Sequence, residues 1–145
     1  MKNALSPKSR RPFLLREFRG VNPEHIERLR AVGIRNAAQM LAAGETAEKR
    51  VALAREAGIP DEAILELVKL SDLARLPGVK GIRARLYYDA GVDCVEKMAA
   101  WEPEALRVMV AEYVQRTGFE GIAPLPAEAR STVANARKLP KVVEY

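Results

Sequence analysis

The feature that most constrains the fold of this chain is a short glycine phrase that occurs twice, once in each half. The first copy runs from Gly20-Val21 to Gly33-Ile34, and the second from Gly78-Val79 to Gly91-Val92. Thirteen positions separate the two glycines in each copy, and the residues between them have helical periodicity. Because glycine tolerates the positive φ of a tight turn, each copy predicts a helix held between two corners.

Helical periodicity and helix-ending residues predict short helices along the rest of the chain. Asn22 and Thr46 are expected N-caps, and Gly58 and Gly118 are expected stops. The expected helices cover residues 12–18, 23–32, 36–43, 47–57, 60–75, 82–90 and 126–139, with two more that begin after Asp93 and Glu102. No segment alternates with period two for long enough to predict a strand. The predicted fold class is therefore all-α, with eight or nine short helices.

The doubled phrase also predicts how the chain is divided. We expect a flexible basic arm over residues 1–11, a first helical hairpin repeat over 12–75 and a second over 76–145. A unit of about 60 residues buries so little apolar surface that it is only marginally stable alone. The two halves are therefore expected to share one core, joined by the long helix over 60–75.

Composition excludes several classes of protein. The chain has 145 residues, of which 48% are hydrophobic, which is enough for a sizeable core. It has no apolar run of the length that a membrane span needs, and residues 1–15 lack the apolar stretch of a signal peptide. The single cysteine, Cys94, excludes an internal disulfide and a cysteine-rich zinc site. We expect a cytoplasmic location.

The formal net charge of +5 is concentrated at the N-terminus. Residues 1–16 carry five basic side chains and no acidic one, whereas residues 17–145 hold 19 of each and are formally neutral. A basic arm can follow phosphates, because neutralising them releases counterions. It can equally be a solvated tail, and the charge pattern leaves both interpretations open.

The second copy of the phrase resembles the helix-hairpin-helix family. Residues 73–84 follow the family's apolar-Pro-Gly-apolar-Gly-x-x-x-Ala pattern, except that its second glycine is Lys80 here and a glycine follows one place later. The first copy matches less well, since Asn22 stands at that position and Arg19 replaces the proline. The resemblance implies backbone N–H groups that hold a phosphate at a helix start. The implied nucleic-acid-binding residues are Gly78, Val79, Lys80, Gly81 and Arg83, with a weaker second site at Gly20, Val21 and Asn22.

The chain as a whole is similar to the bacterial DUF4332 proteins. An Ala-Gly-Val-Asp phrase at residues 90–93 and the closing segment 138–145 carry this resemblance, together with the order of the elements over residues 18–145. The resemblance implies the fold. It supplies no catalytic residue, because the family is named for an unknown role.

The sequence around the remaining reactive side chains favours packing roles over catalytic or metal-binding ones. His25 is the only histidine and lacks ligands at metal spacing, and no general base is evident near Cys94. Tyr87, Tyr88 and Trp101 occupy positions expected to pack. There is no Walker A loop, Rossmann glycine pattern or GxSxG. We therefore expect no enzyme, no cofactor, no metal site and no small-molecule substrate.

Two functions follow from these patterns. The first is non-sequence-specific binding of the DNA or RNA backbone through the second hairpin. The alternative is a protein-protein interaction or scaffolding module with no nucleic-acid role, which the neutrality of residues 17–145 favours. The sequence identifies neither the physiological partner nor the oligomeric state.

Overall fold

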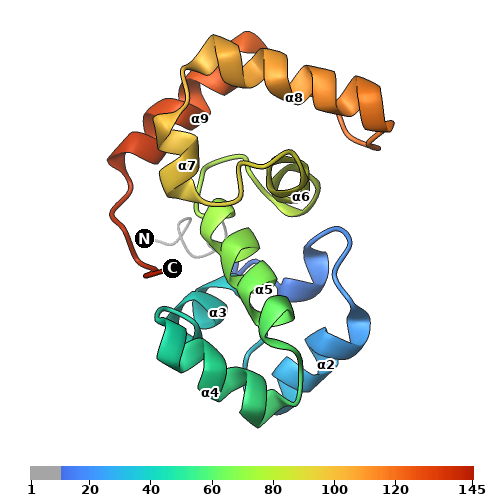
Figure 1. The fold of residues 1–145 in the computed structure, drawn as a ribbon, viewed down its shortest axis with the longest axis vertical. Helices are drawn as coiled ribbons and strands as arrows, with labels where there is room; N and C mark the ends of the chain where they lie inside the picture. Colours follow the sequence, from blue (N-terminus) through green and yellow to red (C-terminus); the bar gives the residue numbers. More distant parts are fainter. Residues whose placement is uncertain (1–10) are drawn as a thin grey trace, which may run out of the picture.

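The structure is a computed structural model and describes residues 11–145. This part of the chain consists of short helices linked by tight turns. This part contains eight α-helices, one 3-10 helix and no strand, which confirms the all-α prediction (Figure 1). Residues 1–10 of the expected arm lie outside the described residues. The elements are η1 (Leu15–Glu17), α2 (Pro23–Ala31), α3 (Ala37–Ala43), α4 (Ala47–Ala57), α5 (Asp61–Leu73), α6 (Gly81–Asp89), α7 (Val95–Ala100), α8 (Pro103–Thr117) and α9 (Pro126–Lys138).

Local side-chain caps fix the starts of α2, α3, α4 and α8. Asn22 accepts a hydrogen bond from the Glu24 amide at 2.9 Å, and Thr46 accepts one from the Lys49 amide at 3.2 Å, as the sequence predicts. The expected cap at Asp93 is wrong. The N-cap of α7 is Cys94, and the carboxylate of Asp72 in α5 accepts the hydrogen bond of the Val95 amide at 3.0 Å.

The helix expected over residues 12–18 is reduced to the single turn of η1. Its first residues are instead held extended beside the start of α3. The Leu15 amide donates to the Arg35 carbonyl at 2.9 Å, and the Ala37 amide donates to the Phe13 carbonyl at 2.8 Å. Leu14 and Asn36 form an isolated antiparallel bridge. These long-range bonds compete with the helix that the local sequence allows.

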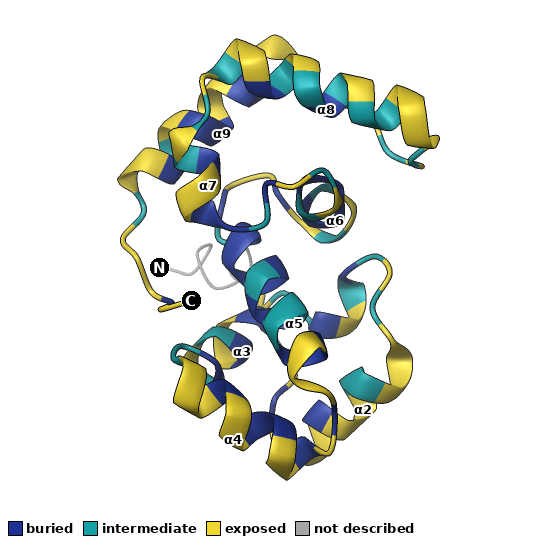
Figure 2. Ribbon diagram, in the orientation of Figure 1, coloured by how far each residue is buried: buried dark blue, intermediate teal, exposed yellow. Residues whose placement is uncertain are grey.

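Helix α5 lies at the centre of the molecule, between the group of α2, α3 and α4 and the group of α6 to α9 (Figure 1). It packs against α3, α4 and α6, while α9 packs against α7 and α8. Most of α5 is buried (Figure 2). Its buried apolar residues are Ala63, Ile64, Leu67, Val68, Leu70 and Leu73. One contiguous core therefore includes residues from both sides of α5.

The glycine corners at equivalent places in the two copies have the same backbone conformation. Gly20 and Gly78 both have φ of +79°, and Gly33 and Gly91 have φ of +91° and +101°. After each helix an apolar amide closes the turn. Ile34 donates to the Leu29 carbonyl at 2.9 Å, and Val92 donates to the Tyr87 carbonyl at 2.9 Å. Such bonds, which reach back past the glycine into the last helical turn, are those of a glycine-ended helix.

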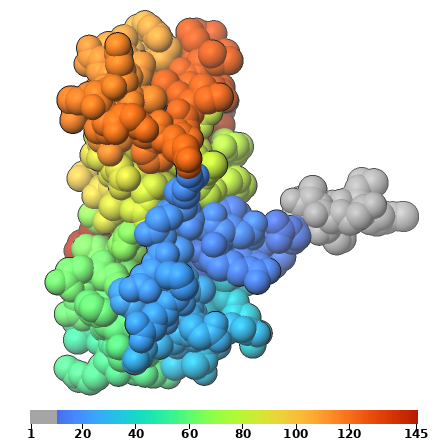
Figure 3. All heavy atoms as spheres, turned by 90° about the vertical axis from the view of Figure 1, so that its right-hand side faces the viewer, coloured from blue at the N-terminus to red at the C-terminus, as the bar shows by residue number. Residues whose placement is uncertain are grey.

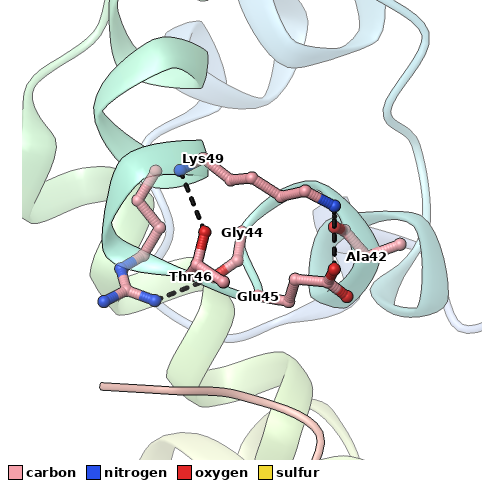
Figure 4. A network of polar contacts seen from close by, with 6 residues as sticks. Ala42, Gly44, Glu45, Thr46 and Lys49 are labelled. Carbon is pink, nitrogen blue, oxygen red and sulfur yellow. Dashed lines mark hydrogen bonds and ion pairs between the residues drawn. The ribbon is translucent and has the colours of Figure 1, made fainter.

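Residues 140–145, the C-terminal strap, run back from α9 to the turn between α3 and α4. The Glu144 amide donates to the Glu45 carbonyl at 2.8 Å. Arg50 Nη1 donates to the carbonyls of Gly44 at 2.9 Å and Glu144 at 3.0 Å. Figure 4 shows the same turn, where the Lys49 ammonium reaches Glu45 at 2.8 Å. The strap therefore folds over its own molecule.

A helix that crosses a bilayer must be both long and apolar. Among the helices of residues 11–145, none combines the two properties to the extent that crossing requires.

Candidate nucleic-acid interface

The second hairpin is an outward-facing corner anchored by apolar side chains on both sides. Leu76 is fully buried and Val79 is 2% exposed, and the Val79 amide donates to the Leu76 carbonyl at 3.0 Å. Gly78 lies between them, exposed, with nothing within 4 Å of where a Cβ would stand. The corner thus presents the backbone of Gly78 to the solvent, between the exposed side chains of Pro77 and Lys80.

Helix α6 begins at this corner without a side-chain cap. Its N-cap residue is Lys80, whose ammonium can only donate, and no side chain caps the first turn. At the start of α2 the equivalent position is Asn22, which caps the Glu24 amide. The first amides of α6 are therefore donors that an anion can use, favoured by the helix dipole.

Gly81 allows η1 to pack closely against the start of α6. A Cβ at this position would overlap the carbonyl oxygen of Glu17 in η1, so only glycine fits without a shift. The Arg19 amide donates to the Gly81 carbonyl at 3.3 Å. Figure 3 shows blue atoms of the N-terminal part of the chain meeting orange atoms of the C-terminal part. Arg19 forms an ion pair with Glu120 in the loop after α8.

Four basic side chains lie near the second hairpin in the sequence, and the structure divides them into two pairs. Arg75 and Arg85 hold the fold together. Arg75 bonds Asp72 at 2.8 Å and the Pro140 carbonyl at 2.6 Å. Arg85 is buried, and its guanidinium bonds Glu66 at 2.6 Å and the Arg19 carbonyl at 2.7 Å. Neither is available to a ligand.

Lys80 and Arg83 form the second pair. Lys80 is exposed, and its ammonium lies 3.3 Å from the Ala74 carbonyl. Arg83 is half-buried, with Nη2 3.6 Å from a Glu128 carboxylate oxygen. Its other terminal nitrogen, Nη1, is buried and has no hydrogen-bond partner among the described residues. Arg83 therefore has an unused donor beside the corner.

A pocket of about 310 Å³ lies against the corner. The hairpin contributes Gly78, Val79, Arg83 and Tyr87, and α9 contributes Glu128, Ser131 and Thr132. Burial raises the pKa of the Tyr87 hydroxyl. The pocket thus combines hydroxyl groups and one guanidinium with a single carboxylate. The α9 residues were missed in the sequence, because nothing in their spacing indicates that α9 lies beside this corner.

The first hairpin borders a larger opening. Val21 is half-buried there, whereas Gly20 and Asn22 are exposed. A groove of about 730 Å³ lies beside them, between η1 and α2. Arg16 and Arg35, which line it, were not among the expected site residues, since only the packing of η1 brings them to this hairpin.

The other chemically active side chains are placed as packing groups. Cys94 is 5% exposed, and burial raises the pKa of its thiol. Tyr87 is 1% exposed, whereas Tyr88, Trp101 and His25 are half-buried. Within residues 11–145 there is no group of three or more His, Cys, Asp or Glu side chains that could hold a metal ion.

Comparison with known proteins gives a family but no individual relative. The family described as "Domain of unknown function (DUF4332)" matches residues 19–139 of the chain. No curated protein and no solved structure matches it.

Proposed function

The chain belongs to the DUF4332 family, whose description assigns no activity, and we propose from its site that it is a non-catalytic module that binds the nucleic-acid backbone through its second hairpin. In this proposal residues 12–75 and 76–145 are tandem helix-hairpin-helix repeats. The matching φ of Gly20 and Gly78 and the shared nine-residue length of α2 and α6 support the repeat. A location in the cytoplasm is part of the same proposal.

The observation that carries the proposal is the uncapped start of α6 at an exposed glycine corner. Gly78 lets a phosphate approach the backbone, and the first amides of α6 have no capping side chain. Lys80 and the half-buried guanidinium of Arg83 add positive charge near that place. Contacts of this kind are to phosphate and carry no sequence information, so binding is non-specific. The basic N-terminal arm would assist it.

The direct test is duplex DNA binding measured by fluorescence anisotropy across a salt series. Two or three phosphate contacts predict a slope of log affinity against log salt of about −2 to −3. Lys80→Glu and Arg83→Gln should both weaken binding. Arg55→Gln, an exposed arginine on α4 away from the corner, is the matched control and should leave it unchanged. Absence of binding at low salt would end the proposal.

A specific observation also favours a second candidate, a protein-interaction module. Ile82, Ile122 and Leu125 are 47%, 79% and 64% exposed. The loop after α8 lies over the start of α6, since a Cβ at Gly121 would stand 3.2 Å from Ile82. An exposed apolar patch of this kind marks interaction surfaces. Capture of a protein from extract that survives nuclease treatment and is lost in Ile122→Asp would favour this candidate over nucleic-acid binding.

A further inference from the structure

The first-hairpin groove, the opening of about 730 Å³ between η1 and α2, has an apolar floor. Its size lies within the range of known ligand sites. The side chains of the floor come from η1, the glycine corner, α2 and the turn after it, so the groove exists only where these elements meet. The apolar lining residues are Leu14, Phe18, Val21, Ile26 and Ile34.

The lining of the groove is positively charged. Three arginines, Arg16, Arg30 and Arg35, lie along it against one acidic residue, Glu27. Arg30 lies 3.6 Å from Glu27, but its side chain is 60% exposed and the pair is weak. Arg16 and Arg35 are exposed, and neither is within ion-pair distance of an acidic side chain in residues 11–145, although the charge of Arg16 helps to lower the pKa of Glu17. A ligand of this groove must therefore combine apolar groups with negative charge.

The equivalent face of α6 is covered by polypeptide. Gly81 and Arg85 occupy in the second copy the places that Pro23 and Glu27, two residues of the groove, occupy in the first. Gly81 packs directly under the Glu17 carbonyl, and Arg85 Nε donates to the Arg19 carbonyl at 2.7 Å. A short stretch of backbone therefore fits this face of a hairpin helix. On α2 the same face is open, since Pro23 and Glu27 are exposed.

We propose that the first-hairpin groove is a docking site for an acidic peptide segment of a partner protein. One or two bulky apolar side chains of the peptide occupy the floor, and its carboxylates lie beside Arg16, Arg30 and Arg35. The polypeptide cover of α6 argues for a peptide, and the charge of the lining argues for an acidic one. Nucleic acid fits less well, because Phe18, the one aromatic residue of the lining, is 3% exposed and offers no stacking face.

The test uses a phage-displayed library of random dodecapeptides selected on the full chain. The proposal predicts enrichment of peptides in which Asp or Glu flanks Leu, Phe or Trp. The enriched peptides are then synthesised and their affinities measured by anisotropy. Arg30→Glu/Arg35→Glu should weaken binding at least about tenfold, because like charges placed together across an interface are strongly unfavourable. The matched control Arg55→Glu/Arg28→Glu, on exposed positions outside the groove, should retain it.

An NMR titration tests the same proposal on the wild-type protein, without any substitution. In ¹⁵N-labelled wild-type protein, titration with an enriched peptide should shift amide resonances within residues 14–35 and leave those of α8 unchanged. Selection without acidic-apolar enrichment, or shifts confined to another surface, would overturn the proposal. It would also be overturned if the groove variants abolished self-association, since the occupant would then be a second copy, or if duplex DNA displaced the peptide.

The two proposed sites are separable. Arg83→Gln should weaken DNA binding and leave peptide binding intact. Arg30→Glu/Arg35→Glu should weaken peptide binding at least about tenfold whether or not the second hairpin binds DNA.

Discussion

Single residues in this protein tie distant segments together through backbone contacts. Arg85 is the clearest case, because one buried guanidinium bonds Glu66 in α5, Asp89 in its own helix and the carbonyl of Arg19. Gly81 does the same through the absence of a side chain, because the Glu17 carbonyl lies where its Cβ would stand. The position of η1 on α6 thus depends on two residues one helical turn apart.

Gly81→Ala should therefore destabilise the protein by about 1–3 kcal/mol, the usual cost of overpacking. The added methyl would meet backbone, which yields less readily than a flexible side chain. Urea denaturation monitored by circular dichroism measures the change. The control is Gly78→Asn, because asparagine tolerates the left-handed conformation and the space around Gly78 is open. Equal stability of Gly81→Ala and the wild type would contradict this packing role.

At the residue scale, sequence reasoning succeeded where neighbours decide the outcome. The caps at Asn22 and Thr46 need only the next two or three amides, and both are present. It failed at Asp93, because the Val95 amide at the start of α7 donates its hydrogen bond to the distant carboxylate of Asp72 in α5. It also could not show that Arg83 would lie beside Glu128, since that pair joins α6 to α9.

At the scale of elements, α2 and α6 differ in how much of each helix is covered by other segments of the chain. Both helices have nine residues and both follow a glycine with φ of +79°. Only Leu29 of α2 is buried, whereas α6 buries four residues, Ala84, Arg85, Leu86 and Tyr87. The start of α6 lies under η1, and the groove face of α2 is open. Two similar sequence phrases therefore present two different surfaces.

The C-terminal strap leads to a prediction about Arg50. Arg50→Met should destabilise the protein by about 2 kcal/mol, because the carbonyls of Gly44 and Glu144 would lose their shared donor in a mostly buried place. Hydrogen exchange of the Glu144 amide should also accelerate, since the strap would separate from Glu45. Both quantities can be measured on one sample series by urea denaturation and by NMR.

Lys49→Met is the matched control for that substitution. Lys49 is adjacent, exposed and paired with Glu45 at the surface, so its loss should change stability by no more than about 0.5 kcal/mol (Figure 4). If the two variants behaved alike, Arg50 would not be the residue that holds the strap.

The whole molecule depends on α5, which packs against helices on both sides. Leu70 is fully buried in it. Leu70→Ala should lower the free energy of unfolding by about 2–5 kcal/mol, and because the core is continuous it should loosen α3 and α6 together. Hydrogen exchange followed by mass spectrometry on peptides from these two helices tests this. Val51→Ala, on the exposed face of α4, is the control and should have little effect. Loosening of one helix alone would indicate two separate cores.

At this scale the sequence predicted the fold class and the number of helices, since both follow from local periodicity and from glycine stops. It did not predict the groove between η1 and α2. That opening depends on the bonds that Leu15 and Ala37 make across the start of α3, which join segments far beyond the reach of helical periodicity. The residues of the two candidate sites that were missed, Arg16, Arg35 and those of α9, all depend on such contacts.

The strap has a consequence for biosynthesis. Arg50 and Glu144 are 94 positions apart in the sequence. A ribosome that adds about 5–20 residues per second therefore adds Glu144, whose carbonyl accepts the bond, roughly 5–20 seconds after Arg50. During that interval Arg50 can already bond the Gly44 carbonyl, but the Glu45 carbonyl has no strap amide to accept from and must bond water. If translation stalled before residue 144, the helices could still form, but the strap could not bond Arg50 or Glu45. We expect quality-control proteases to degrade such an incomplete chain.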